Sequence, residues 1–354
     1  MLTRRKQGLG LKAAICGVFL GATAWLAGSV AADAAETVVF AGWGGGMQEN
    51  QRKIVFDPFE KATGIKVIDV PGVGITKIKA MVEAKNVEWD VVQNIAMWVP
   101  QGQREGLWEE LDYKVIDRTG VPDAMVEKYA LGNSTFGQIL AYNTKAFPPG
   151  NEPKTWADLW NTEKYPGPRG MFDGPRYSLE IALMADGVAP DKLYPLDVDR
   201  AFKSLDRMKP KVHVWWKQWP QAPQLLGAGE IVLAHTSNTR VATLKKAENV
   251  PVEIMWNQGM MTIDWLSVPK GAKNKANAMK LISYMNKPEL QAQLAKAAGM
   301  GPANTKAFDH LSDAEKKEMP SYYFQQGTMV RFGDAWWAEN LSKMEEQWNA
   351  WKLK

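Results

Sequence analysis

The sequence predicts an α/β protein made of two units. Short apolar strands alternate with amphipathic helices from residue 37 onward, a pattern typical of sheets that are mainly parallel. A length of 354 residues favours two domains. No low-complexity linker separates the two halves, so we expect strands to join the units as two lobes with a cleft between them.

Residues 1–34 have the pattern of a secretory signal peptide. A basic start is followed by an apolar run over 13–30 and by the small-residue motif Ala32-Asp33-Ala34, which is a typical cleavage site. The alternative is an uncleaved membrane anchor, because the apolar run is long for a signal. Arg4-Arg5 resembles a twin-arginine motif only weakly, so the export route stays open.

Cleavage would change the charge and the thiol content of the chain. It would remove four basic residues and one acid, so the formal charge falls from +4 to +1. A near-neutral protein makes nucleic acid an improbable partner. The single cysteine, Cys16, also lies in this segment. The mature chain then has no disulfide and no cysteine ligand or nucleophile, which fits a protein of the bacterial periplasm.

The first unit is expected to alternate strands and helices. An apolar strand begins at Thr37 and breaks into glycines by residue 46. Residues 54–70 predict a helix that stops at Gly64 and a second strand. An amphipathic helix follows over 75–86, and residues 89–94 form a third strand. Polar residues at the ends of such strands mark where these sheets bind ligands.

The second unit is expected to begin with a strand that crosses out of the first one. That strand covers 136–144, and a new unit begins within 155–173. Further strands are predicted at 230–235, 252–256 and 261–269. A helix pair over 275–299 stops at Gly299, and the last fifty residues are helical and rich in tryptophan.

Motifs for catalysis and for cofactors are missing. The three histidines, His213, His235 and His310, lack the spacing of a metal site, and no H-E-x-x-H occurs. The glycines at 42–46 match neither a P-loop nor a dinucleotide fingerprint. Residues 132–137 lack the G-x-S-x-G spacing. We therefore expect a binding protein without cofactor or metal, and we keep a secreted enzyme of unknown class as the alternative.

The order of several motifs resembles a known family. FAGWGGG (40–46), WADLW (156–160) and the segment from Asp264 to Asn304 are the most specific. They resemble the periplasmic solute-binding proteins of ABC importers, in the spermidine/putrescine-binding branch. The resemblance implies a two-lobed type II fold whose lobes are mixed, mainly parallel sheets flanked by helices, with one ligand in the interlobe cleft. It also implies hinge closure, no catalysis, a permease and an ATPase as partners, and a monomer. The predicted lobes are residues 35–142 plus 264–308, and residues 143–263 plus 309–354.

The resemblance also places candidate ligand-binding residues. Asp264 falls on the family's acidic position, inside an apolar strand, and Trp43 falls on its first aromatic position. An ammonium group gains from a carboxylate and from an aromatic face. The complete predicted set lies at strand ends and in the loops that follow them: Trp43, Asn94, Trp216, Asn238, Arg240 and Asp264.

This chain departs from the polyamine binders at several pocket positions. Glycines at 44–46 replace an acidic neighbour, Gly174 and Tyr177 replace two acids, and Thr262 and Met300 replace aromatics. A long polyamine would find about one counter-charge. Arg240, twenty-four residues before Asp264, resembles instead the γ-aminobutyrate-binding subgroup, in which an arginine takes the carboxylate and the aspartate takes the amine. Arg176 is a second candidate for the carboxylate.

The stretch HVWWKQWP (213–220) concentrates three tryptophans. Valines beside Trp215 and Trp216 indicate that one ring is core, and alternation along an extended segment turns the other away. We predict that Trp216 forms a wall of the cleft. The expected ligand is a small amine such as putrescine or spermidine, or an ω-amino acid such as γ-aminobutyrate. An opine or another organic solute, and a sensory rather than a transport role, stay as alternatives.

Overall fold

The computed structural model describes residues 36–354, and residues 35–354 form one compact unit. The predicted signal peptide, residues 1–34, lies outside the described residues. No helix of the described part is long and apolar enough to cross a membrane.

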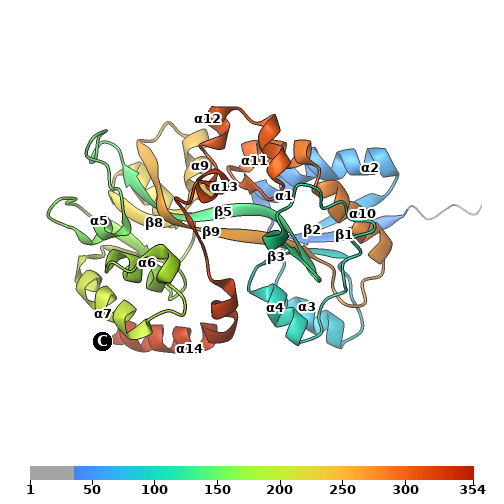
Figure 1. The fold of residues 1–354 in the computed structure, drawn as a ribbon, viewed down its shortest axis with the longest axis horizontal. Coiled ribbons are helices and arrows are strands. Elements are labelled where there is room, and N and C mark those ends of the chain that lie inside the picture. Colours follow the sequence, from blue (N-terminus) through green and yellow to red (C-terminus); the bar gives the residue numbers. More distant parts are fainter. Residues whose placement is uncertain (1–35) are drawn as a thin grey trace, which may run out of the picture. The chain divides into compact units, whose positions relative to one another are not determined.

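One mixed sheet runs through the whole of this unit (Figure 1). Its strand order is β2-β1-β3-β9-β5-β8-β6-β7, with β4 and β10 paired to β5 and β11 paired to β9. β1 is parallel to β2 and β3, and β6 is parallel to β7 and β8. The strands are β1 (Thr37–Gly42), β2 (Lys66–Pro71), β3 (Val91–Ile95), β4 (Val126–Glu127), β5 (Ala130–Asn143), β6 (Arg169–Phe172), β7 (Val214–Trp216), β8 (Leu233–Ser237), β9 (Val252–Ser267), β10 (Gly301–Pro302) and β11 (Val330–Arg331).

Two long antiparallel strands, β5 and β9, connect the two ends of the sheet. β9 is continuous, whereas the sequence predicted separate strands at 252–256 and 261–269. The polar residues and the glycine between these segments suggested a turn. In the fold they form an irregularity in the ladder, where Gln258 adopts a positive φ of 60°. Backbone and side-chain carbonyls of Gln258 accept hydrogen bonds from Trp156, at 2.8 and 3.1 Å, which fixes this bend.

Helices at the β1–β3 end cover both faces of the sheet. The helical run begins at Gly45, earlier than the predicted residue 54, and ends as predicted at Gly64, whose φ is 76°. That conformation suits glycine as a helix cap. These helices are α1 (Gly45–Gln51), the π-helical η1 (Arg52–Phe56), α2 (Asp57–Thr63), α3 (Ile75–Glu83), α4 (Trp98–Arg104), α10 (Lys275–Met285) and α11 (Pro288–Ala298).

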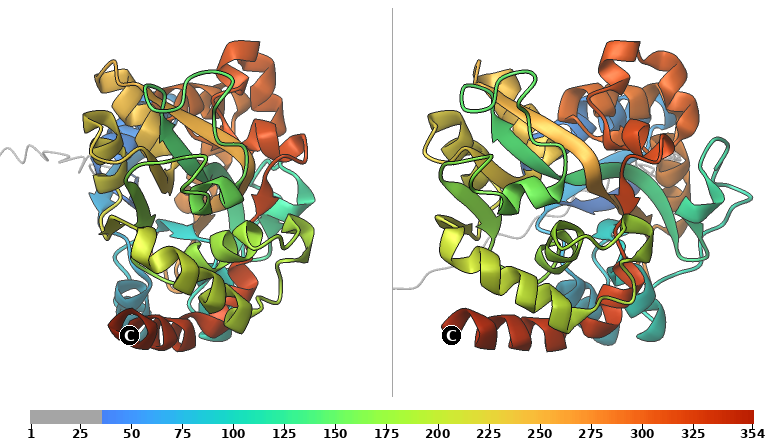
Figure 2. Two further views of the ribbon diagram at one scale, coloured as in Figure 1. Left: turned by 90° about the vertical axis from the view of Figure 1, so that its left-hand side faces the viewer. Right: turned by 60° about the vertical axis from the view of Figure 1, so that its left-hand side comes forward.

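The other end of the sheet carries the predicted C-terminal helix and several helices that the sequence did not reveal. α6 is buried along nearly its whole length and has no polar face, so its pattern lacks the usual amphipathic period. Figures 1 and 2 both show α14 lying alongside α7. The helices of this end are α5 (Trp156–Trp160), α6 (Ser178–Ala185), α7 (Val198–Met208), α8 (Gln221–Ala228), α9 (Asn238–Ala247) and α14 (Asp334–Leu353). α12 (Asp313–Lys316) packs beside α11, and α13 (Pro320–Gln325) packs against β5 and β9.

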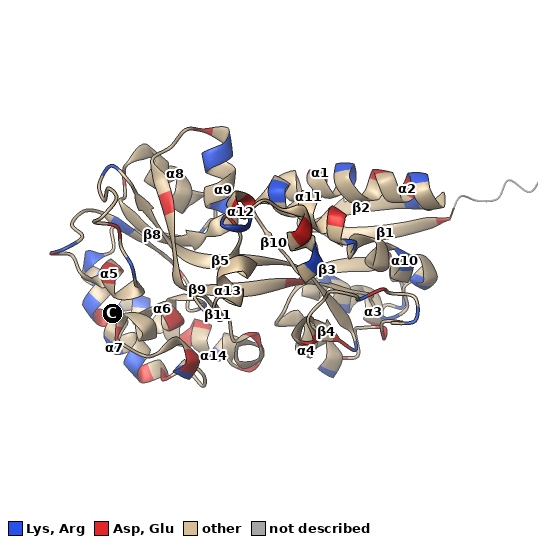
Figure 3. Cartoon of the chain, turned by 45° about the horizontal axis from the view of Figure 1, so that its top comes forward, with Lys and Arg blue, Asp and Glu red and all other residues tan. Residues whose placement is uncertain are grey.

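Charged residues concentrate on the helices and loops, and the strands of the sheet consist mainly of other residue types (Figure 3). On β9 only Glu253 and Asp264 carry an acidic group; Glu253 is exposed and Asp264 is 3% exposed. The buried acid on a central strand therefore stands apart from the rest of the charge distribution.

Candidate functional site

Asp264 lies at the centre of the sheet, where β9 passes between β3 and β5. It is paired with Ile95 on β3 and with Ser134 on β5. Burial raises the pKa of Asp264 to about 7, and the nearby polar groups of Trp43 and Ser134 offset only part of that rise. No cation of residues 36–354 lies within ion-pair distance of it. A buried carboxylate without a counter-charge is costly, so this group is suited to a cationic ligand.

Trp43 follows β1 and reaches the same place. Its indole lies close enough to Asp264 to lower the pKa of that carboxyl, and its ring lies 5.7 Å from the ring of Trp98, tilted by 48°. The side chain is 37% exposed, which leaves part of an aromatic face open beside the carboxylate. The structure thus brings together two of the residues predicted from sequence.

Asn94 does not join this pair. It is fully buried on β3 opposite Trp265, one residue away from the Ile95–Asp264 pair. Because side chains alternate along a strand, Asn94 lies on the other face of the sheet from Asp264. Its side-chain nitrogen and oxygen have no hydrogen-bond partner among the described residues.

The prediction that Trp216 forms a cleft wall requires a correction. The side chain is 0% exposed, with its ring 4.9 Å from Phe172 and 5.6 Å from His235. Its indole N–H donates to the His235 carbonyl oxygen at 3.0 Å. Trp216 is core because β7 adds to the sheet beside β6 and turns this ring inward. Trp219, which stacks on Phe172 at 5.6 Å, keeps part of its surface exposed.

Asn238 and Arg240 lie in the first turn of α9. The Asn238 carbonyl accepts from the Gly137 N–H at 2.8 Å, and its amide donates to the Gly299 carbonyl at 2.7 Å. The side chain is fully buried, so it ties α9 to β5 and to the end of α11. Arg240 is exposed and forms no ion pair with the described residues, which leaves its guanidinium available to an anion.

An aromatic group between β6 and α14 was not predicted as part of the site. Tyr177 packs against Phe332 at 4.6 Å and against His235 at 5.9 Å. Burial raises the pKa of Tyr177 to about 12, and the charge of Asp264 contributes to that rise. The sequence identified Tyr177 only as a replacement for an acid. Phe332 directly follows β11. No sequence pattern pointed to it, because a strand of two residues is too short to predict.

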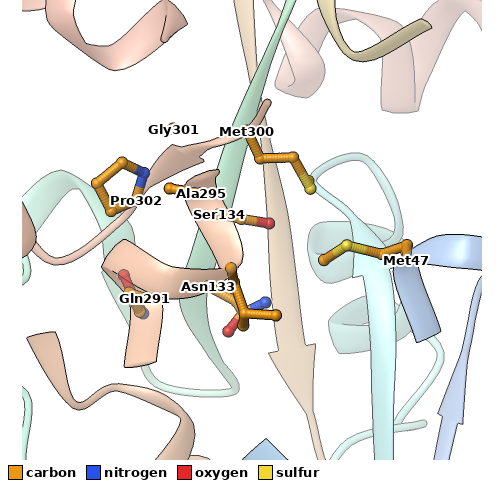
Figure 4. Close-up of a pocket in the computed structure, with 9 residues that line it drawn as sticks. Met47, Asn133, Ser134, Gln291, Ala295, Met300, Gly301 and Pro302 are labelled. Carbon is orange, nitrogen blue, oxygen red and sulfur yellow. The ribbon is translucent and has the colours of Figure 1, made fainter. Parts of the chain in front are cut away.

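A small cavity lies next to the Asp264 site (Figure 4). Ser134, which is paired with Asp264 in the sheet, is one of its lining residues. Met47 of α1 and Met300 beyond α11 point toward one another across it. Its volume is about 10 Å³, enough for roughly one water molecule. Met300 is the residue that replaces a family aromatic, so the thioethers supply an adaptable apolar edge to the site.

The described residues hold no group of three or more His, Cys, Asp or Glu side chains that could bind a metal ion. His235 is fully buried, and its Nε2–H donates a hydrogen bond to the Gln138 side-chain oxygen at 2.9 Å. Burial lowers its pKa to about 3, so it stays neutral and serves the core at this site.

The mixed sheet with helices at both ends and the buried, unpaired acid on β9 fit a protein that binds a solute. The chain matches the bacterial extracellular solute-binding protein family over residues 55–321. It therefore belongs to this family, as the sequence predicted, and has the two-lobed fold of periplasmic binding proteins.

The chain is similar to named binding proteins and to solved structures that include an ABC transporter substrate-binding protein. The chain is 32% identical to the gamma-aminobutyric acid-binding protein of Pseudomonas aeruginosa, over 93% of this chain and 95% of that one. Among solved structures, an ABC transporter substrate-binding protein from Bradyrhizobium japonicum is 34% identical, with a TM-score of 0.84 and coverage of 89% and 99%. A protein described as a GABA receptor is 36% identical, with a TM-score of 0.81 and coverage of 89% and 97%.

Proposed function

We propose that the mature protein captures a small solute with both an ammonium and a carboxylate group, such as γ-aminobutyrate, in the periplasm. One observation carries this proposal: Asp264 is buried beside an open aromatic face and has no protein counter-charge. A ligand ammonium would supply that charge and gain from the Trp43 ring. The relatives named for γ-aminobutyrate support the choice of solute.

The remaining roles follow from this assignment. Arg240, exposed and unpaired among the described residues, offers a planar fork for the carboxylate. The two lobes close on the solute as contacts to both of them select the closed form. The loaded monomer delivers the solute to a permease and its ATPase, and it performs no catalysis itself.

A thermal-shift screen of residues 35–354 tests the proposal. The panel holds γ-aminobutyrate, other ω-amino acids, putrescine, spermidine, an opine, common amino acids, sugars and metal ions. A solute at a hundredfold excess over its Kd stabilises the folded state by about 2.7 kcal/mol, which raises the Tm by roughly 5 °C. We expect this shift with γ-aminobutyrate and a smaller one with putrescine.

The same screen identifies the alternative. Spermidine carries several ammonium groups, and the site offers Asp264 as its one deeply placed acid beside Trp43. A shift with spermidine that exceeds the shift with γ-aminobutyrate would contradict our assignment and favour a polyamine carrier. If none of the amine-bearing solutes raises the Tm, the proposed solute class is wrong.

A further inference from the structure

Arg176 lies in the loop between β6 and α6, and its guanidinium has no ion-pair partner among the described residues. Its guanidinium carbon lies 5.0 Å from the centre of the Tyr177 ring and 5.3 Å from that of Phe332. It forms no ion pair within residues 36–354, and its buried Nε has no hydrogen-bond partner there. The aromatic faces hold this cation in place but do not neutralise it.

Acids near Arg176 leave most of this charge unpaired. The charge of Arg176 lowers the pKa of both Glu180 and Asp334. Neither carboxylate lies within ion-pair distance of the guanidinium. Burial raises the pKa of Glu180 to about 7 and that of Asp334 to about 6. One carboxylate oxygen of Glu180 is already bonded to the Tyr194 hydroxyl at 2.7 Å. Arg176 is therefore a cation that a solute anion can still satisfy.

The backbone fixes the loop that carries Arg176. Tyr177 has a φ of 68°, which costs a non-glycine residue on the order of 1–3 kcal/mol. Packing of its ring against Phe332 and His235 and its carbonyl bond from the Ile181 N–H at 2.9 Å hold that conformation. The guanidinium is thus positioned before any ligand arrives.

This cation adjoins the Asp264 site through shared neighbours. Tyr177 packs on His235, which is bonded to Gln138. Gln138 and Ser134 lie on one face of β5 with regular pairing between them, and Ser134 is paired with Asp264. On the other side, the Phe332 N–H donates to the Met261 carbonyl at 3.0 Å, three residues before Asp264.

We propose that Arg176 is a specificity-determining residue of the solute site, which favours a ligand carboxylate and disfavours a second ammonium group. This inference rests on the proposed function and adds a second arginine to it. Arg176 acts through its fixed charge near the solute chain, and Tyr177 and Phe332 form the platform that aims it. In a diamine of the same length as γ-aminobutyrate, an ammonium group takes the place of the carboxylate, and the Arg176 guanidinium repels it.

Titration calorimetry of residues 35–354 with γ-aminobutyrate and with putrescine tests this role. In Arg176→Gln we expect the ratio of the two Kd values to shift by at least tenfold toward putrescine. Arg176→Lys keeps the charge and should keep the ratio within about threefold. Arg200→Gln is the matched control, because Arg200 is already paired with Asp186 at 2.6 Å, and it should leave the ratio unchanged.

Other outcomes overturn the inference. If Arg176→Gln weakens both ligands equally, or neither, Arg176 only supports the loop. If Arg176→Gln does not fold, Arg176→Lys decides: a Kd ratio that shifts by more than about threefold although the charge is kept contradicts a role for that charge. Failure of the unmodified protein to bind either ligand is a different result, since it contradicts the proposed function itself and the inference falls with it.

Discussion

At the scale of single residues, the protonation state of Asp264 governs the site. An aspartate on a surface is ionised throughout the neutral range, but burial raises the pKa of this one to about 7. A ligand ammonium stabilises the ionised form. Binding of a cation therefore includes release of a proton from Asp264 at pH values below 7.

This coupling predicts a pH-dependent affinity. A protonated carboxyl cannot pair with an ammonium group, so the Kd for an amine-bearing solute should fall about tenfold per unit as pH rises toward 7, and then level off. Calorimetry between pH 5 and 8.5 measures the profile. Asp264→Asn should weaken binding by roughly a hundredfold and flatten the profile; full affinity in this variant would remove Asp264 from the site.

The same group affects the stability of the unliganded protein. Its folded pKa of about 7 lies above the ordinary 3.8, so the folded state binds more protons than the unfolded state between these values. The stability that this group contributes is therefore greatest below pH 4 and is lost as pH rises to 7. In urea unfolding, the free energy of unfolding of Asp264→Asn should exceed that of the unmodified protein. This difference should grow as pH rises from 4 to 7, to on the order of 4 kcal/mol.

At the scale of elements, the start of α9 shows how a residue that looks functional can serve the fold. Asn238 follows β8 in a position suited to a ligand contact. Its amide instead bonds two backbone groups, Gly137 and Gly299, from two other elements. Both partners are buried with it, so water cannot replace the bonds.

We expect Asn238→Ala to lower the free energy of unfolding by about 2–4 kcal/mol, because two buried backbone groups lose their partner. Chemical denaturation monitored by tryptophan fluorescence measures the change. Asn257→Ala, which removes one exposed bond to the Lys154 carbonyl, should cost less than about 1 kcal/mol. Equal effects in the two variants would show that Asn238 does not tie these elements together.

At the scale of the whole described unit, β5 and β9 are the strands that span both ends of one sheet. The proposed closure of the lobes then bends these strands and the segments beside them. Small-angle scattering of residues 35–354 should show a smaller radius of gyration when γ-aminobutyrate saturates the protein. Asp264→Asn at the same ligand concentration should show no decrease. A radius that does not change in the unmodified protein would contradict closure.

The sequence was informative wherever a local pattern decides the structure. Gly64 and Gly299 end helices at the predicted residues because only a left-handed cap suits those positions. Trp43 and Asp264 could be paired because the motifs around them are continuous in the chain. The buried helix α6 was missed, since a helix without a polar face lacks the periodicity that sequence analysis detects.

The sequence by itself determined the family, the alternation of strands and helices, and an acid placed in an apolar strand. Tertiary structure alone decided which side chains meet. Strand alternation sends Asn94 to the opposite face from Asp264, the addition of β7 to the sheet buries Trp216, and β11 brings Phe332 to Arg176. These contacts join residues far apart in the chain, and only the pairing of the strands sets their distances.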